Sequence, residues 1–140
     1  MSFAIRLAGI ADVRAMHRLR NSVRENRLSD PQRISEASYL PFVAAGSSWI
    51  AETDTCILGF GIIDANKANV WALFVDAGAE GRGVGQALLS QIIKWSRAKG
   101  LGQLSLSTGI GKRAVQFYER AGWKKAGTTV DGEVLYVMKL

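Results

Sequence analysis

The segment that most constrains the fold is an apolar run followed by a glycine-rich turn and a long amphipathic stretch. The run Val70-Trp71-Ala72-Leu73-Phe74-Val75 is typical of a central strand that is covered on both faces. From about Gly83 to Lys99 apolar side chains recur at helical spacing, and Gly100 is a suitable stop. The glycine loop, Gly81-Arg82-Gly83-Val84-Gly85, lets a ligand approach the backbone where this helix begins. Backbone N–H groups and the helix dipole there predict binding of a phosphate-bearing ligand, with a purely structural turn as the alternative.

The rest of the chain supplies further strands and helices. Strands are expected at residues 3–7, 49–53, 57–63, 103–107, 123–130 and 134–140, and helices at about 10–25, 35–45 and 112–121. Pro41 should kink or shorten the second helix, and Gly59 and Gly61 suggest a bulge or a close backbone approach. Asp131-Gly132 is a strong hairpin signal. The order β-α-α-β-β-β-α-β-α-β-β predicts an α/β or α+β fold with a mixed sheet.

Length and composition fit one domain over residues 1–140. Apolar residues make up 48% and charged residues 21%, which argues against wholesale disorder. The chain has one cysteine, Cys56, and one histidine, His17, so we expect neither an internal disulfide nor a metal site. No apolar run approaches the ~20 residues of a membrane span, and the N-terminus lacks the apolar region of a secretion signal. The expectation is a cytoplasmic protein without membrane contact.

Basic residues give the chain a net charge of +6, which favours anionic ligands or surfaces. Arginines concentrate in the first fifth of the chain, and a second basic cluster comprises Lys112, Arg113, Arg120, Lys124 and Lys125. A nucleic acid is one possible partner for such clusters. Aromatic residues are not interleaved with them, however, as a platform for stacked bases would require. No nucleic acid is therefore expected, and a solvated basic face is the simpler interpretation.

Two common nucleotide-binding signatures do not fit the glycine loop, because Gly85 is followed by Gln86 rather than Lys-Ser/Thr or a third spaced glycine. Phe74-Val75 followed by Glu-Gly-Arg-Gly-Val-Gly-Gln-Ala-Leu-Leu at 80–89 resembles the coenzyme A-binding signature of the GNAT N-acetyltransferase superfamily. Residues 113–123, Arg-Ala-Val-Gln-Phe-Tyr-Glu-Arg-Ala-Gly-Trp, resemble that family's next motif. The resemblance covers essentially the whole chain. It implies an acetyl-CoA-dependent N-acetyltransferase with a mixed, mostly antiparallel sheet flanked by helices.

The resemblance also implies residue roles at the donor site. Backbone groups of three residues would bind the pantetheine arm: Leu73, Phe74 and Val75. Backbone N–H groups would bind the pyrophosphate at Arg82, Gly83, Val84, Gly85, Gln86 and Ala87. Tyr118 would be the general acid that protonates the departing thiolate, since a phenol is still protonated at neutral pH. The alternative for Tyr118 is a core aromatic role beside Phe117. Contacts to the adenosine 3′-phosphate would come from Lys112, Arg113 and Arg120.

Three positions depart from the family pattern. The family often has Arg or Gln where this chain has Glu80, whose carboxylate would repel pyrophosphate unless it faced solvent. Gly111 stands where an asparagine often contacts the cofactor, so that contact is either missing or made by backbone. Some members carry a glutamate base on the central strand, and the matching residue is Asn69, which cannot accept a proton.

The acceptor amine must lose a proton before it attacks, because a ~10 pKa ammonium is mostly protonated at pH 7. Glu52 and Glu25, acting through water, are the candidate bases, although a solvated surface charge is the favoured interpretation of each. For the acceptor site the first choices are Arg24, Glu25 and Asn26. Cys56 lies outside both motifs, so direct attack within a ternary complex is expected rather than an acetylated cysteine. The acceptor is a primary amine of a small molecule or a protein, and a homodimer stays open.

Two other function classes remain as alternatives. One is a non-catalytic acyl-CoA-binding sensor on the same fold, which Asn69 and Gly111 favour. The other is a small basic nucleic-acid-binding domain, which would show salt-sensitive binding.

Overall fold

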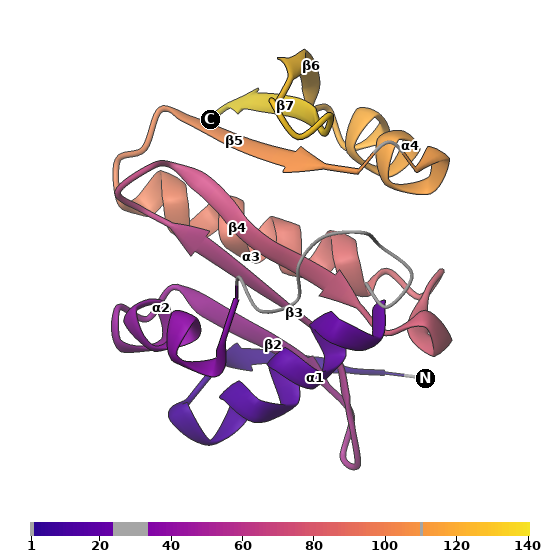
Figure 1. Cartoon of the computed structure of the whole chain (residues 1–140). Helices are drawn as coiled ribbons and strands as arrows, with labels where there is room; N and C mark the ends of the chain where they lie inside the picture. The colour runs from indigo at the N-terminus through magenta and orange to yellow at the C-terminus, as the bar shows by residue number, and fades with distance from the viewer. Residues whose placement is uncertain (1, 24–33, 110) are drawn as a thin grey trace.

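A seven-stranded sheet with the order β1-β2-β3-β4-β5-β7-β6 organises the protein (Figure 1). The structure, a computed structural model, describes residues 2–23, 34–109 and 111–140. The strands are β1 (Ala4–Leu7), β2 (Ser48–Glu52), β3 (Ile57–Asp64), β4 (Asn69–Val75), β5 (Gln103–Thr108), β6 (Lys124–Thr128) and β7 (Val134–Lys139). Neighbouring strands are antiparallel except for the parallel pair β4 and β5. The predicted mixed, mostly antiparallel sheet is confirmed, with the predicted order of elements.

Helices cover both faces of the sheet (Figure 1). They are α1 (Val13–Val23), α2 (Leu40–Ala44), α3 (Val84–Ala98) and α4 (Lys112–Arg120), with short 3₁₀ segments η1 (Ile10–Asp12), η3 (Glu36–Tyr39) and η4 (Ala77–Ala79). α3 and α4 pack on one face and α1 and α2 on the other. Each face therefore has its own apolar core.

The two N-terminal helices differ in detail from the sequence prediction. The first begins as the 3₁₀ segment η1 and continues as α1 to Val23, where the described range ends. The predicted helix at 35–45 is divided into η3 and α2. Pro41 lies in the first turn of α2, where its missing N–H removes no helical hydrogen bond. Proline therefore marks the start of a new helix here, as the expected shortening implied.

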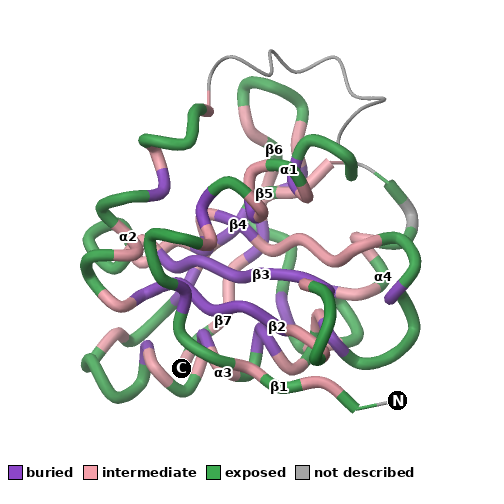
Figure 2. The backbone as a smooth tube through the Cα atoms, turned by 90° about the horizontal axis from the view of Figure 1, so that it is seen from below, coloured by how far each residue is buried: buried purple, intermediate pink, exposed green. Residues whose placement is uncertain are grey.

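α3 lies unusually close to β3, and this fixes its position over the sheet. A Cβ at Gly59 would lie 3.2 Å from Cγ1 of Val84 and 3.3 Å from Cδ1 of Leu88, and one at Gly61 would lie 3.0 Å from Cδ1 of Ile92, all on α3. The Cβ at Gly59 would also lie 2.7 Å from the backbone carbonyl oxygen of Phe74 on β4. Neither position can take a side chain unless its neighbours move, so the predicted close backbone approach is confirmed. Buried residues concentrate on β2 and β3 between the two helical layers (Figure 2).

The sheet divides between β4 and β5. Ile62 pairs with Ala72 and Ile63 with Val70, so Trp71 is an extra, bulged residue of β4. A bulge bends its strand, and β4 shares one register pair with β5, Asn69 with Ser105. The Asn69 side-chain amide strengthens that contact by donating to the carbonyl oxygen and the hydroxyl of Ser105, at 3.2 and 3.1 Å. Beyond this pair β5 runs apart from β4, and β5, β7 and β6 form a separate part of the sheet (Figure 1).

Candidate active site

The connection from β4 to α3 holds the glycine loop in an extended surface turn. Asp76 follows β4 and accepts a hydrogen bond from the Gly78 N–H at 3.3 Å, which begins η4. Gly81 and Gly83 have φ values of +82° and +81°, a backbone conformation that strongly favours glycine. A Cβ at either glycine would meet no heavy atom within 4 Å. The loop therefore needs glycine for its backbone conformation, and the space beside both residues is open.

The first turn of α3 begins directly at this loop. Gly83 is the N-cap residue, and the Ala87 N–H donates to its carbonyl oxygen at 3.0 Å. The N–H groups of Val84, Gly85 and Gln86 precede that bond and have no acceptor within the helix. These three groups and the positive end of the helix dipole suit an anion. Among the N–H groups at 82–87 that were predicted to bind pyrophosphate, that of Ala87 therefore makes a hydrogen bond inside α3 instead.

α4 packs beside this turn because the third glycine of the loop makes room for it. A Cβ at Gly85 would lie 3.4 Å from Cζ of Phe117 and 3.5 Å from Cγ2 of Val75. Gly111 is the exposed N-cap of α4, with φ −57° and no side-chain cap. The start of α4, like that of α3, therefore presents backbone N–H groups at the surface.

Glu80, the first departure from the family pattern, forms an ion pair across these two helix starts. Its Oε2 lies 3.2 Å from NH1 of Arg113, and the two side chains are 40% and 73% exposed. Glu80 is exposed, as expected, and its charge is offset by Arg113. Arg82 and Arg120 are also exposed near the same helices. Arg120 lies in the last turn of α4, so Arg82 and Arg113 are the arginines at the two helix starts.

Tyr118 belongs to α4, and its side chain lies in the core. It is 7% exposed, and its ring centroid lies 5.0 Å from that of Phe117, 6.0 Å from Trp123 and 5.9 Å from Tyr136. Burial raises the pKa of the Tyr118 phenol. No hydrogen bond of its hydroxyl is found within the described part of the chain. The side chain therefore combines a core position with a phenol that stays protonated at neutral pH.

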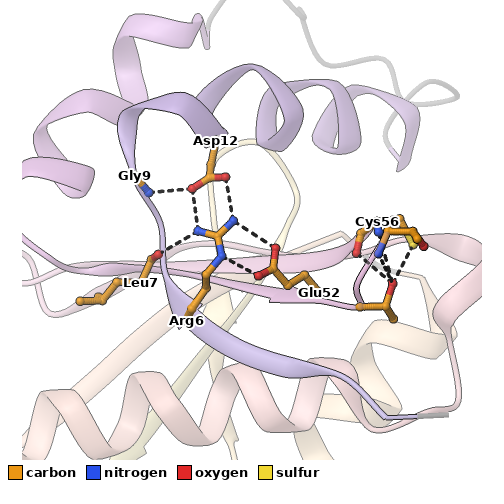
Figure 3. A network of polar contacts seen from close by, with 8 residues as sticks. Arg6, Leu7, Gly9, Asp12, Glu52 and Cys56 are labelled. Atoms are coloured by element: carbon orange, nitrogen blue, oxygen red, sulfur yellow. Dashed lines mark hydrogen bonds and ion pairs between the residues drawn. The ribbon is translucent and has the colours of Figure 1, made fainter.

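Glu52, one of the candidate bases, belongs to an ion-pair network at the β1 edge of the sheet (Figure 3). The Arg6 guanidinium donates to its two carboxylate oxygens at 2.7 and 3.1 Å and to both oxygens of Asp12 at 2.9 Å. Hydrogen bonding by Arg6 lowers the pKa of Asp12. Both oxygens of Glu52 are occupied two strands away from the β4–β5 division, so a structural role explains this residue. Close to Glu52, exposed Cys56 closes a short turn with Thr53.

The predicted acceptor residues Arg24, Glu25 and Asn26 lie outside the described residues. Asn69 lies at the division of the sheet, where its amide holds β5. His17 donates to or accepts from the Tyr39 hydroxyl at 3.1 Å, as a packing residue.

One residue that the sequence interpretation missed is Arg20, on the opposite face of β4 from α3. It is 8% exposed, and its Cζ lies 5.0 Å from the ring centroid of Trp71 and 4.9 Å from that of Phe74. Its NH1 atom is buried without a hydrogen-bond partner. The sequence does carry a signal for this burial, because Val13, Met16 and Arg20 follow the i, i+3, i+7 spacing of a buried helix face. These three are the buried residues of α1.

A family model described as the acetyltransferase (GNAT) family matches residues 13–123. The chain belongs to this family. An N-acetyltransferase of Methanocaldococcus jannaschii without an assigned substrate is 29% identical over 85 residues, which are 60% of this chain and 34% of that protein. The match thus spans about a third of that relative's length.

Solved GNAT structures show the same fold. PaiA N-acetyltransferase from Thermoplasma acidophilum, crystallised with coenzyme A, superposes with a TM-score of 0.85 at 20% identity over 100% of both chains. YncA from Salmonella typhimurium, a protein crystallised with acetyl-CoA, gives a TM-score of 0.77 at 19% identity, covering 100% of this chain and 94% of the other. The family model confirms the prediction of the GNAT acetyltransferase family, and the solved structures confirm the predicted fold.

Within residues 2–23, 34–109 and 111–140, no three His, Cys, Asp or Glu side chains are grouped so that they could hold a metal ion. No helix in these ranges is long and apolar enough to cross a membrane.

Proposed function

We propose that this chain transfers the acetyl group of acetyl-CoA to a primary amine of a small molecule or a protein. The single observation that carries the proposal is the division between β4 and β5 beside the glycine loop, in a chain of the acetyltransferase family. A ligand arm with amide groups can extend a sheet at such a division, because it offers the hydrogen bonds of a strand.

The described residues suit acetyl-CoA as the acetyl donor. Leu73, Phe74 and Val75 lie on β4 beyond its one pair with β5, where the pantetheine arm would run. The space beside Gly81 and Gly83 and the N–H groups of the first turn of α3 suit the pyrophosphate. Arg113 supports the proposed contact to the adenosine 3′-phosphate, because guanidinium groups bind phosphate oxygens well. Arg120, in the last turn of α4, is the other described candidate for this contact, and the predicted side chain of Lys112 lies outside the described ones. Bidentate binding would require Arg113 to exchange Glu80 for the phosphate.

Bound acetyl-CoA supplies a thioester whose carbonyl carbon forms a bond to the amine nitrogen while its bond to sulfur breaks, giving an amide and a thiol. We assign to Tyr118 the proton that the sulfur receives. Its raised pKa keeps the phenol protonated at neutral pH, so the proton is in place before the reaction. Asn69 cannot take the amine proton, and Glu52 is held by Arg6. We propose that water carries this proton, with Glu25 as the remaining candidate base.

An amine-library screen with acetyl-CoA as donor and free-thiol detection tests the proposal. We expect thiol release with a subset of amines. Arg82→Glu should weaken acetyl-CoA binding at least about tenfold in calorimetry, because a charge-assisted contact to phosphate is reversed. Lys94→Glu is the matched control, since Lys94 is exposed on α3, the helix that follows the glycine loop, and carries the same charge as Arg82. Equal affinity of the two variants would count against the loop assignment.

A second candidate function is non-catalytic binding of acyl-CoA. Asn69 in place of a carboxylate and Gly111 in place of asparagine favour it. Calorimetric binding of acetyl-CoA without thiol release across the amine library would support this function instead. The cytoplasmic location, the homodimer and the domain bounds 1–140 stay predictions.

A further inference from the structure

We propose that Arg20 binds a carboxylate of the acceptor, so that the acceptors are amino acids or similar amines that carry a carboxylate. The inference rests on the proposed acetyl transfer for its use in catalysis. It stands on the position of one buried guanidinium and on its NH1 atom, which has no hydrogen-bond partner.

Arg20 is a buried cation without a buried anion. Arg20 is 8% exposed, and its NH1 atom has no hydrogen-bond partner. No ion pair of Arg20 occurs in the described part of the chain. Glu36, on η3, lies in a loose pair with Arg14 at 3.9 Å instead. A buried charge normally requires a partner of opposite sign, because desolvation without one costs several kcal/mol.

Aromatic rings offset only part of this desolvation. The guanidinium lies 5.0 Å from the Trp71 centroid and 4.9 Å from the Phe74 centroid, within cation–π range. Such contacts engage the face of the guanidinium, so the N–H donors of NH1, which lie in its plane, stay without an acceptor. The Tyr39 hydroxyl contacts Nδ1 of His17 at 3.1 Å. Burial raises the pKa of this hydroxyl, and the nearby Arg20 guanidinium opposes that shift by its charge and by hydrogen bonding. The arrangement thus orients Arg20 and leaves the donors of NH1 for a ligand.

The two rings place Arg20 at the division of the sheet. Trp71 is the bulged residue of β4, just after the last pair with β5, and Phe74 lies in the segment proposed to bind the pantetheine arm. Arg20 approaches β4 from the α1 side, whereas α3 and α4 cover the other face. The proposed phosphate contacts belong to α3 and α4, so Arg20 is not needed for the donor.

A carboxylate is the anion that suits this position. A planar guanidinium donates two parallel hydrogen bonds to a carboxylate, and a partly enclosed site strengthens them. An acceptor with both an amine and a carboxylate is an amino acid, a related amino carboxylate or a peptide fragment with a free carboxyl end. A polyamine would instead bring further positive charge toward Arg20.

The first test needs no variant. Each of the twenty L-amino acids is compared with its C-terminal amide and with the amine that lacks the carboxyl group, using thiol release from acetyl-CoA. We expect kcat/KM to be at least about tenfold higher for the acids among the amines that react. Amides that react as well as the acids would overturn the proposal.

The second test separates ligand binding from a purely structural role of Arg20. Arg20→Gln should lower kcat/KM about 10- to 100-fold for acids and little for amides, with unchanged acetyl-CoA affinity in calorimetry. Arg20→Lys should restore part of the preference, since it keeps the charge without the planar fork. Arg18→Gln is the matched control, because Arg18 is an exposed arginine on the same helix. Equal losses for acids and amides would show a structural role and overturn the proposal.

A binding measurement keeps the inference independent of turnover. Saturation-transfer NMR with N-acetyl-L-amino acids and their amides, in the presence of coenzyme A, reports product binding directly. Acids that bind the wild type but not Arg20→Gln would support the carboxylate site even if no amine reacts, and that result would refute only the proposed catalysis. Acids that bind no better than amides would overturn the inference, whatever the activity.

Discussion

Gly83→Ala and Gly100→Ala form a matched pair that tests the anion-binding loop. Both glycines flank α3, with φ values of +81° and +80°, and a Cβ at either would meet nothing within 4 Å. Gly83 precedes the first turn, in the glycine loop, and Gly100 follows the last turn. The two substitutions therefore add the same methyl group with the same backbone strain at opposite ends of one helix.

The expected stability loss is similar for both variants. An alanine in the left-handed region is disfavoured by about 1–2 kcal/mol, and the lower entropy of the unfolded variant returns about 0.4–1 kcal/mol of this. A net loss of about 1 kcal/mol corresponds to a fall in Tm of roughly 4 °C for a chain of this size. Thermal melts followed by circular dichroism measure it.

Acetyl-CoA affinity should separate the two variants. The methyl group at position 83 would occupy the space through which an anion reaches the N–H groups of Val84, Gly85 and Gln86. Loss of even one charge-assisted hydrogen bond weakens binding about tenfold or more. Gly100→Ala should bind like the wild type. Calorimetry that shows equal affinities for the two variants would refute the placement of the pyrophosphate at this loop.

Three further predictions concern other regions. Tyr118→Phe should lower kcat about 100-fold with unchanged acetyl-CoA affinity; because burial raises the pKa of Tyr118, the wild type should also lose stability above about pH 10, and the variant less. Gly111→Asn should raise stability by a few tenths of a kcal/mol in urea unfolding and tighten acetyl-CoA binding, since φ is −57° and the position is open. Asp12→Asn should lose about 1 kcal/mol at pH 7. Arg6 lowers the pKa of Asp12, so this difference should vanish as the pH falls below about 4, and a constant difference in urea unfolding would contradict it.

Local signals predicted the elements around the donor site. The apolar run of β4, the glycine loop and the periodicity of α3 each depend on residues close in sequence, and all three occur as expected. The Asp131-Gly132 hairpin does too, since Gly132 has φ +82° and its N–H donates to the Thr129 carbonyl oxygen at 3.0 Å. Short-range backbone preferences therefore carried most of the fold.

Contacts between distant residues could not be predicted in the same way. Arg6 and Glu52 are 46 positions apart, and they meet because β1 pairs with β2. This strand pairing gives Glu52 an ion-pair partner, and so it removes Glu52 as a candidate base. Arg20 is one of the arginines concentrated in the first fifth of the chain, which predict a solvated basic face. Its position in α1 nevertheless matches the spacing of the buried residues of that helix. Its partners, Trp71 and Phe74, come from β4, so its environment depends on how α1 crosses the sheet.

The single pair that joins β4 to β5 leaves two strand edges in the interior of the sheet rather than at its rim. Strand edges with unused hydrogen-bonding groups tend to recruit a strand from another chain, and proteins usually protect them. In the proposed complex the pantetheine arm lies along these edges and shields them. Bound acetyl-CoA would then also hinder self-association. The ligand-free protein should form intermolecular β-structure more readily than the protein saturated with acetyl-CoA.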